Sequence, residues 1–137
     1  MATSLSPGAG GTAEVKERLA EIEIALSHLQ ALQVQYDQDM WDINDPDFSK
    51  MNHIHLHLSK TVGKLAAMVE PMDHKNHHDG DVDVHALAAV IGPIVADLVL
   101  HAAQLANLTD QNVGAALRSR YRDNASRFAP ASIFADL

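Results

Sequence analysis

The chain has no cysteine among its 137 residues. Disulfide bonds, thiol catalysis and thiolate zinc sites are therefore excluded. Aromatic residues are scarce as well, at 4% of the chain with a single tryptophan. Alanine and leucine must consequently supply most of the core, as is usual for packed helices. We find no glycine-rich phosphate loop and no GxSxG nucleophile motif.

Cationic residues are outnumbered, with 10 Lys and Arg against 18 Asp and Glu and a formal net charge of −8. This balance opposes general binding to nucleic acid backbone or anionic lipid, so we expect neither a nucleic-acid nor a membrane partner. The longest apolar stretch, residues 82–108, is interrupted by His85, Pro93, Asp97 and His101 and predicts a buried helix. The first residues lack a basic end and an apolar run, so we expect a cytoplasmic protein.

The length suits one domain with one core, and a hydrophobic content of 47% argues against a disordered chain. Residues 1–12 are rich in glycine and predict a flexible tail. Residues 129–137 alternate small and apolar side chains and predict an irregular tail. We therefore expect a single all-α domain over residues 13–128.

The first helix is predicted from Ala13 to about Tyr36, with Thr12 as its cap. Its apolar residues recur at spacings of four and three: Val15, Leu19, Ile22, Leu26 and Leu29. This stripe is equally consistent with a dimer seam and with an intramolecular bundle face. The polar residues 37–48 include Asn44-Asp45-Pro46 and predict a loop that carries Trp41.

A second helix is predicted over residues 49–69, with Pro71 ending it. Helical spacing places four side chains along one side of it: His53, His57, Lys60 and Lys64. Residues 71–83 predict a loop. A third helix over 83–107 should contain a kink, or consist of two abutting helices, at Gly92-Pro93.

A fourth, basic helix is predicted to begin at a Thr109 or Asp110 cap and to reach about Arg127. The architecture is therefore all-α with four to five helices.

Several of these pieces together resemble a known family. Trp41, the stretch HLHLSKTVGKLAAMVE and the stretch IVADLVLHAAQLANLTDQNVGAALRSRYRDNASRF are similar in order and spacing to MazG-like all-α nucleotide pyrophosphohydrolases, dCTP pyrophosphatases in particular. The likeness covers about residues 39–128. It implies a MazG-like bundle, a homo-oligomer, and magnesium-assisted hydrolysis of a nucleoside triphosphate to a monophosphate and pyrophosphate.

The sequence departs from the family at the metal site. The family holds magnesium with two acids on each of two helices, in EVGEL and ELxD patterns, since this hard cation prefers oxygen ligands. The first pattern corresponds here to Thr61-Val62-Gly63-Lys64-Leu65, and Ile94 replaces an acid of the second. Only Asp97 remains, so three of the four acids are replaced.

Two interpretations of this departure are open. In the first, Lys64 and Asp97 are the remaining catalytic-site residues and pair across the helix interface, which leaves a pseudo-site that still binds a ligand. In the second, a transition metal occupies a displaced site. The expected ligands of this displaced site are His53, His57, Asp97 and His101, because the two residues of each helix are four apart and share a face.

The resemblance also assigns contacts with a nucleotide or another small phosphorylated ligand. Its phosphate-binding positions correspond to Arg120, Asn124 and Arg127, and Trp41 is a further candidate contact, although a lone tryptophan is more often a core residue. The function is therefore a nucleotide pyrophosphohydrolase-related activity. The alternatives are a non-catalytic pseudoenzyme that binds a nucleotide or a protein partner, and a recruited chemistry that uses His57 or His101 as acid or base.

Overall fold

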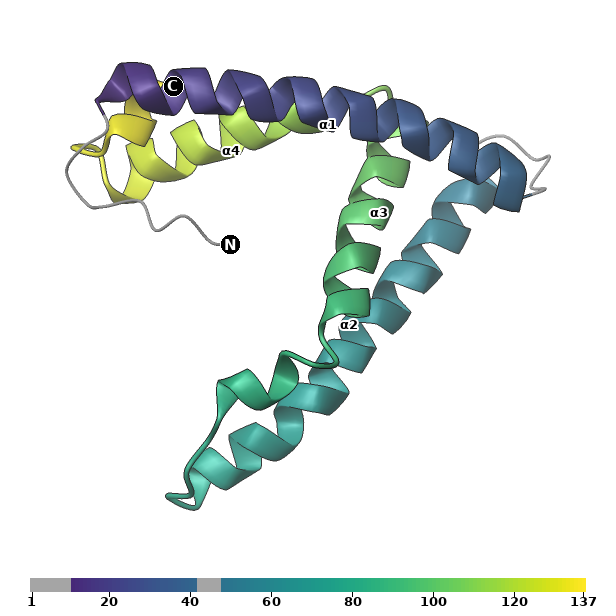
Figure 1. The fold of residues 1–137 in the computed structure, drawn as a ribbon, viewed down its shortest axis with the longest axis vertical. Helices are drawn as coiled ribbons and strands as arrows, with labels where there is room; N and C mark the ends of the chain where they lie inside the picture. The colour runs from purple at the N-terminus through teal and green to yellow at the C-terminus, as the bar shows by residue number, and fades with distance from the viewer. Residues whose placement is uncertain (1–10, 42–47) are drawn as a thin grey trace. The chain divides into compact units, whose positions relative to one another are not determined.

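The computed structural model describes residues 11–41 and 48–137, and within these ranges the chain forms helices and no strand (Figure 1). The prediction of an all-α fold is confirmed. The elements are α1 (Thr12–Met40), α2 (Phe48–His77), the short 3-10 helix η1 (Val84–Leu87), α3 (Gly92–Leu108), α4 (Val113–Phe128) and the 3-10 helix η2 (Ile133–Asp136). None of the described helices is both long enough and apolar enough to cross a membrane.

The chain divides into two compact units. The described part of the first unit contains residues 11–32 and 111–137, and the described part of the second lies within residues 33–110. Helix α1 supplies its longer N-terminal part to the first unit and its last two turns to the second.

The first unit is held together where α4 packs on α1. Leu19 of α1 is buried there. The guanidinium of Arg118 donates two hydrogen bonds to the carboxylate of Glu23, at 2.6 and 3.3 Å, and this contact lowers the pKa of Glu23. Gly114 lies so close to Glu23 that a Cβ atom at this position would be 2.9 Å from the Glu23 Cα atom. Glycine therefore permits the close approach of the two helices.

The start of α4 is capped by side chains from both helices. The side chain of Asn112 accepts a hydrogen bond from the amide of Ala115 at 2.8 Å. Gln30 of α1 accepts one from the amide of Val113 and donates one to the carbonyl of Gln111, each at 2.9 Å. The predicted cap at Thr109 or Asp110 is therefore wrong, and Asn112 is the N-cap residue.

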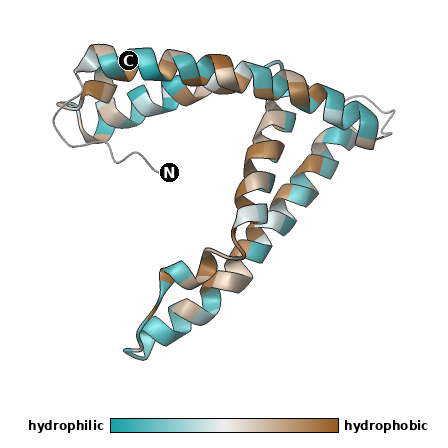
Figure 2. Ribbon diagram, viewed as in Figure 1, coloured by the Kyte–Doolittle hydropathy of each residue, from teal (hydrophilic) through white to brown (hydrophobic). Residues whose placement is uncertain are grey.

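The second unit is built on α2 and α3, which run antiparallel and lie side by side. Its buried side chains combine apolar and polar residues: Gln33, Ile54, Thr61, Ile94, His101, Ala103, Gln104 and Ala106. Figure 2 shows α3 as a mostly apolar helix, whereas the C-terminal end of α2 is hydrophilic. The polar core residues gather toward the last turns of α3.

Several predicted boundaries differ from the structure. Helix α1 continues to Met40 instead of ending near Tyr36, so Trp41 follows the helix directly. The predicted turn at residues 44–46 lies outside the described residues. The tail is not irregular throughout, because η2 forms within it and the ring of Phe134 packs 5.5 Å from the ring of Tyr121.

Proline acts differently at its two positions. Pro71 lies inside α2, which runs on to His77, so the predicted stop is wrong and the loop is reduced to residues 78–83. Good helix formers around it and side-chain contacts four residues apart offset the lost backbone hydrogen bond. These contacts join Glu70 to His74 at 3.8 Å and Asp73 to His77 at 3.4 Å. Pro93 instead lies in the first turn of α3, where proline is well tolerated, and η1 precedes it. The predicted interruption at Gly92-Pro93 is present, but the third helix does not begin near residue 83. Residues 84–87 form only the 3-10 helix η1, and residues 88–91 separate it from α3, so two abutting helices are not formed.

Substitution of Gly114 tests the close contact in the first unit. We expect Gly114→Ala to lower the free energy of unfolding by about 1–3 kcal/mol, because the new methyl group meets the backbone of Glu23. Gly63→Ala is the matched control, since a Cβ there meets nothing within 4 Å. The control should be stabilised by about 0.5–1 kcal/mol through helix propensity. Urea denaturation followed by circular dichroism measures both, and equal stabilisation of the two variants would contradict the close approach.

Candidate functional site

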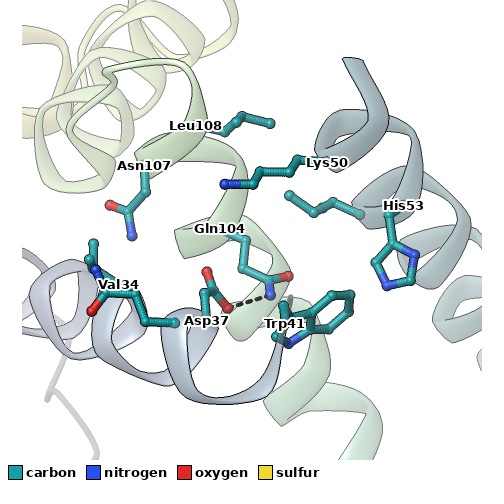
Figure 3. Close-up of a pocket in the computed structure, with 10 residues that line it drawn as sticks. Val34, Asp37, Trp41, Lys50, His53, Gln104, Asn107 and Leu108 are labelled. Atoms are coloured by element: carbon teal, nitrogen blue, oxygen red, sulfur yellow. Dashed lines mark hydrogen bonds between the residues drawn. The ribbon is translucent and has the colours of Figure 1, made fainter. Parts of the chain in front are cut away.

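The second unit contains a pocket of about 290 Å³ between the end of α1, the first turns of α2 and the last turns of α3 (Figure 3). Its lining residues are Val34, Asp37, Gln38, Trp41, Lys50, His53, Ile54, Gln104, Asn107 and Leu108. The volume lies at the lower end of the range for small-molecule sites, about 300–1,000 Å³. It therefore suits a ligand, or part of a ligand, of about the size of a nucleoside.

The walls of the pocket combine apolar surface with a few polar groups. Trp41 and Ile54 supply apolar area, and Lys50 enters from α2 with its ammonium group toward Gln104 and Asn107 of α3 (Figure 3). No acidic side chain of residues 11–41 and 48–137 forms an ion pair with Lys50. The pocket therefore holds the ammonium group of Lys50 and the carboxylate of Asp37 beside an aromatic wall. These groups favour a flat ligand that carries an anionic group and hydrogen-bond donors.

A chain of hydrogen bonds forms one side of the pocket. The carboxylate of Asp37 accepts hydrogen bonds from the amide groups of Gln33 and Gln104, each at 2.8 Å. The Oε1 atom of Gln104 lies 2.9 Å from Nδ1 of His101. Because this amide oxygen can only accept, Nδ1 of His101 carries the proton. In the neutral imidazole the lone pair is then on Nε2.

Three imidazoles and the single indole lie together beside the pocket. We call His53, His57 and His101 the histidine cluster. The ring of Trp41 is 4.3 Å from that of His53 and 5.2 Å from that of His57, in edge-on arrangements. The rings of His53 and His57 are 4.5 Å apart, and those of His57 and His101 are 6.1 Å apart. Since Trp41 and His53 also line the pocket, the cluster and the pocket share one wall.

The electrostatics of the histidine cluster favour a neutral His57. Desolvation by the surrounding side chains lowers the pKa of His57 most, and the positive charges of His53, His101 and Lys60 lower it further. The carboxylate of Asp97 acts in the opposite direction. At neutral pH His57 is therefore an unprotonated imidazole, which can accept a proton or a hydrogen bond.

The structure brings together several of the predicted site residues. The three histidines are neighbours, and Asp97 is close enough to act on the charge of His57. Among the described residues, no three or more histidine, aspartate and glutamate side chains are arranged to hold a metal ion. The metal site with these four ligands thus stays a prediction.

The positions that correspond to the family's acids are now placed. Thr61 and Ile94 are each 3% exposed and lie in the seam between α2 and α3. Lys64 is exposed, and the ion pair predicted between Lys64 and Asp97 is not among those that the described residues form. The side chains that would replace the metal structurally therefore do not meet in this structure.

The remaining predicted contacts lie on α4, in the first unit. Arg120, Asn124 and Arg127 are exposed, and none of them lines the pocket described here. The guanidinium of Arg127 lies 5.0 Å from the centre of the Phe128 ring, a cation–π distance. Their assignment to a phosphate stays a prediction.

Sequence reasoning missed four polar residues that line the pocket, Asp37, Lys50, Gln104 and Asn107, and it also missed Gln33, which donates a hydrogen bond to Asp37. The contact between Gln33 and Asp37 could have been predicted, because glutamine and aspartate four residues apart face each other on a helix. No local pattern joins Asp37 to Gln104, which are 67 residues apart in the chain.

We compared the chain with family models, curated proteins and solved structures, and none of them matches it. The likeness to MazG-like enzymes accordingly stays a prediction from the sequence.

The hydrogen-bond chain is tested by removal of its central amide. We expect Gln104→Leu to lower the free energy of unfolding by about 1–3 kcal/mol, because the His101 proton loses its acceptor and Asp37 loses a donor. Gln35→Leu is the control, since this exposed glutamine also donates to an aspartate, Asp39. The control should change stability by no more than about 0.5 kcal/mol. Equal effects in urea denaturation would mean that the buried chain contributes nothing specific.

Proposed function

We propose that the second unit of this protein binds a nucleotide and does not hydrolyse it. The observation that carries the proposal is the pocket that brings together the indole ring of Trp41, the amide of Gln104, the carboxylate of Asp37 and the ammonium group of Lys50. This ammonium group forms no ion pair with the described residues. The similarity in sequence to nucleotide pyrophosphohydrolases supports the same ligand class independently of the pocket.

The chemistry of the walls fits the parts of a nucleotide. The rings of Trp41 and His53 offer surface for a heteroaromatic base, for which stacking contacts are favourable. The amide nitrogen of Gln104 has a second N–H beside the one donated to Asp37, and this group can donate to a base edge or a ribose hydroxyl. Lys50 can neutralise a phosphate. The pocket volume of about 290 Å³ accommodates the nucleoside part rather than the whole of a nucleoside triphosphate.

Hydrolysis by the family's mechanism is not expected. That mechanism needs several carboxylates to hold magnesium against the phosphates. Threonine and isoleucine side chains supply no carboxylate, and Thr61 and Ile94 are buried in the helix seam. The proposal therefore favours the pseudoenzyme alternative over the pyrophosphohydrolase.

Fluorescence of the single tryptophan provides the test, because Trp41 lines the pocket. We expect saturable changes in emission on titration with nucleoside monophosphates and triphosphates, and no pyrophosphate release in the presence of magnesium. Lys50→Ala should weaken binding about tenfold, which corresponds to about 1.4 kcal/mol. Lys16→Ala, an exposed lysine on α1 in the other unit, should leave the affinity unchanged.

Two outcomes would overturn the proposal. One is a fluorescence titration that stays flat, with no heat of binding in calorimetry, for all common nucleotides up to millimolar concentration. The other is steady turnover of a nucleoside triphosphate, which would show that the chain is an enzyme in spite of the replaced acids.

We also propose that the protein forms a homo-oligomer. Large apolar side chains of α1 and α2 remain more than half exposed: Ile24 (61%), Leu32 (67%), Met40 (64%) and Leu56 (56%). A second copy that covers such side chains gains about 25 cal/mol for each Å² of apolar surface buried. Of the α1 stripe, Leu19 is buried within the first unit, whereas Ile22 is 40% exposed.

Light scattering measures the assembly directly. At micromolar concentration we expect a mass at least twice the 14.8 kDa of one chain. The double variant Ile24→Glu/Leu32→Glu should shift this mass toward the monomer, because the introduced charges resist burial. Lys16→Glu is the control for added negative charge on the same helix. A wild-type protein that is monomeric over this concentration range contradicts the proposal.

A further inference from the structure

Helix α2 presents a row of basic side chains in an acidic protein. We define the basic stripe as Lys50, His53, His57, Lys60 and Lys64, which follow one another at spacings of three, four, three and four residues. This spacing places them on one face of the helix. Fourteen residues separate the first from the last, so the stripe is about 21 Å long at 1.5 Å per residue.

The lysines of the basic stripe lack acidic partners. Within residues 11–41 and 48–137, no ion pair joins Lys50, Lys60 or Lys64 to a carboxylate. Arginines elsewhere in the chain do have such partners, for example Arg118 with Glu23. In a chain with a net charge of −8, this row of cations without acidic partners among the described residues is a local surface that favours an anionic ligand.

The basic stripe begins at the pocket. Lys50 and His53 are pocket-lining residues, whereas Lys60 and Lys64 are exposed further along the same helix. A ligand with its ring beside Trp41 thus has lysine and histidine side chains along the helix face that leads away from the pocket. The lysine side chains are long and flexible, so several of them can converge on one phosphate chain.

We propose that the basic stripe binds the phosphate chain of a nucleoside diphosphate or triphosphate and neutralises it with lysine and histidine in place of metal ions. The inference rests on the proposed function, because the nucleoside part is assigned to the same pocket. It adds that affinity rises with the number of phosphates and does not require a divalent cation.

The test is a calorimetric titration in EDTA with adenosine, AMP, ADP, ATP and inorganic tripolyphosphate as the probes. We expect affinity to rise from adenosine to ATP, with tripolyphosphate weaker than ATP because it lacks the ring. Lys60→Ala/Lys64→Ala should weaken ATP binding about tenfold while changing adenosine binding less than about twofold. Lys60→Arg/Lys64→Arg retains the charge and should retain the affinity, and Lys16→Ala should behave as wild type.

The failures are distinguishable. Equal affinities for adenosine and ATP, or loss of ATP binding in EDTA alone, would overturn the phosphate assignment and leave the nucleoside pocket intact. Tripolyphosphate binding as tight as ATP would overturn the joint use of pocket and stripe. No binding of any of the nucleotides or adenosine would instead remove the proposed function itself.

Discussion

The carboxylate of Asp37 organises the second unit. It accepts one hydrogen bond from the amide of Gln33 on its own helix and one from the amide of Gln104 on α3. The second bond orients the Gln104 side chain so that its oxygen faces His101, and this oxygen determines which nitrogen of His101 carries the proton. A buried hydrogen bond contributes about 0.5–1.5 kcal/mol, whereas a buried polar group left without a partner costs about 1–3 kcal/mol. These hydrogen bonds therefore matter more because they disfavour other packing arrangements of the helices than because of the stability that they add.

This polar chain changes what the helix interface can do. The buried set of the second unit includes Thr61, His101 and Gln104 beside isoleucine and alanine. Such an interface is more specific than an apolar one, since every polar member must find its partner. Asp37 and Gln104 also line the pocket, so the same two side chains stabilise the second unit and form one wall of the site.

Particular residues explain where helix ends departed from the sequence prediction. Pro71 is normally a stop, but favourable neighbours on both sides outweigh one missing backbone hydrogen bond. Asn112 caps α4 in place of Thr109 or Asp110, and Gln30 of α1 adds further hydrogen bonds at that point. At the start of α4 the candidate caps differ by about 1 kcal/mol, so small contributions decide the boundary.

The sequence by itself determined that the chain is all-helical, because apolar residues recur with the helical period. It also determined that basic side chains share one face of the second helix, since this depends only on residue identity and spacing. The tertiary structure alone decided that Thr61 and Ile94 are buried, that Lys64 is exposed and that Lys50 lies at a pocket. The physical reason is that burial and hydrogen bonding depend on which helix faces meet, and periodicity within one helix carries no information about its partner.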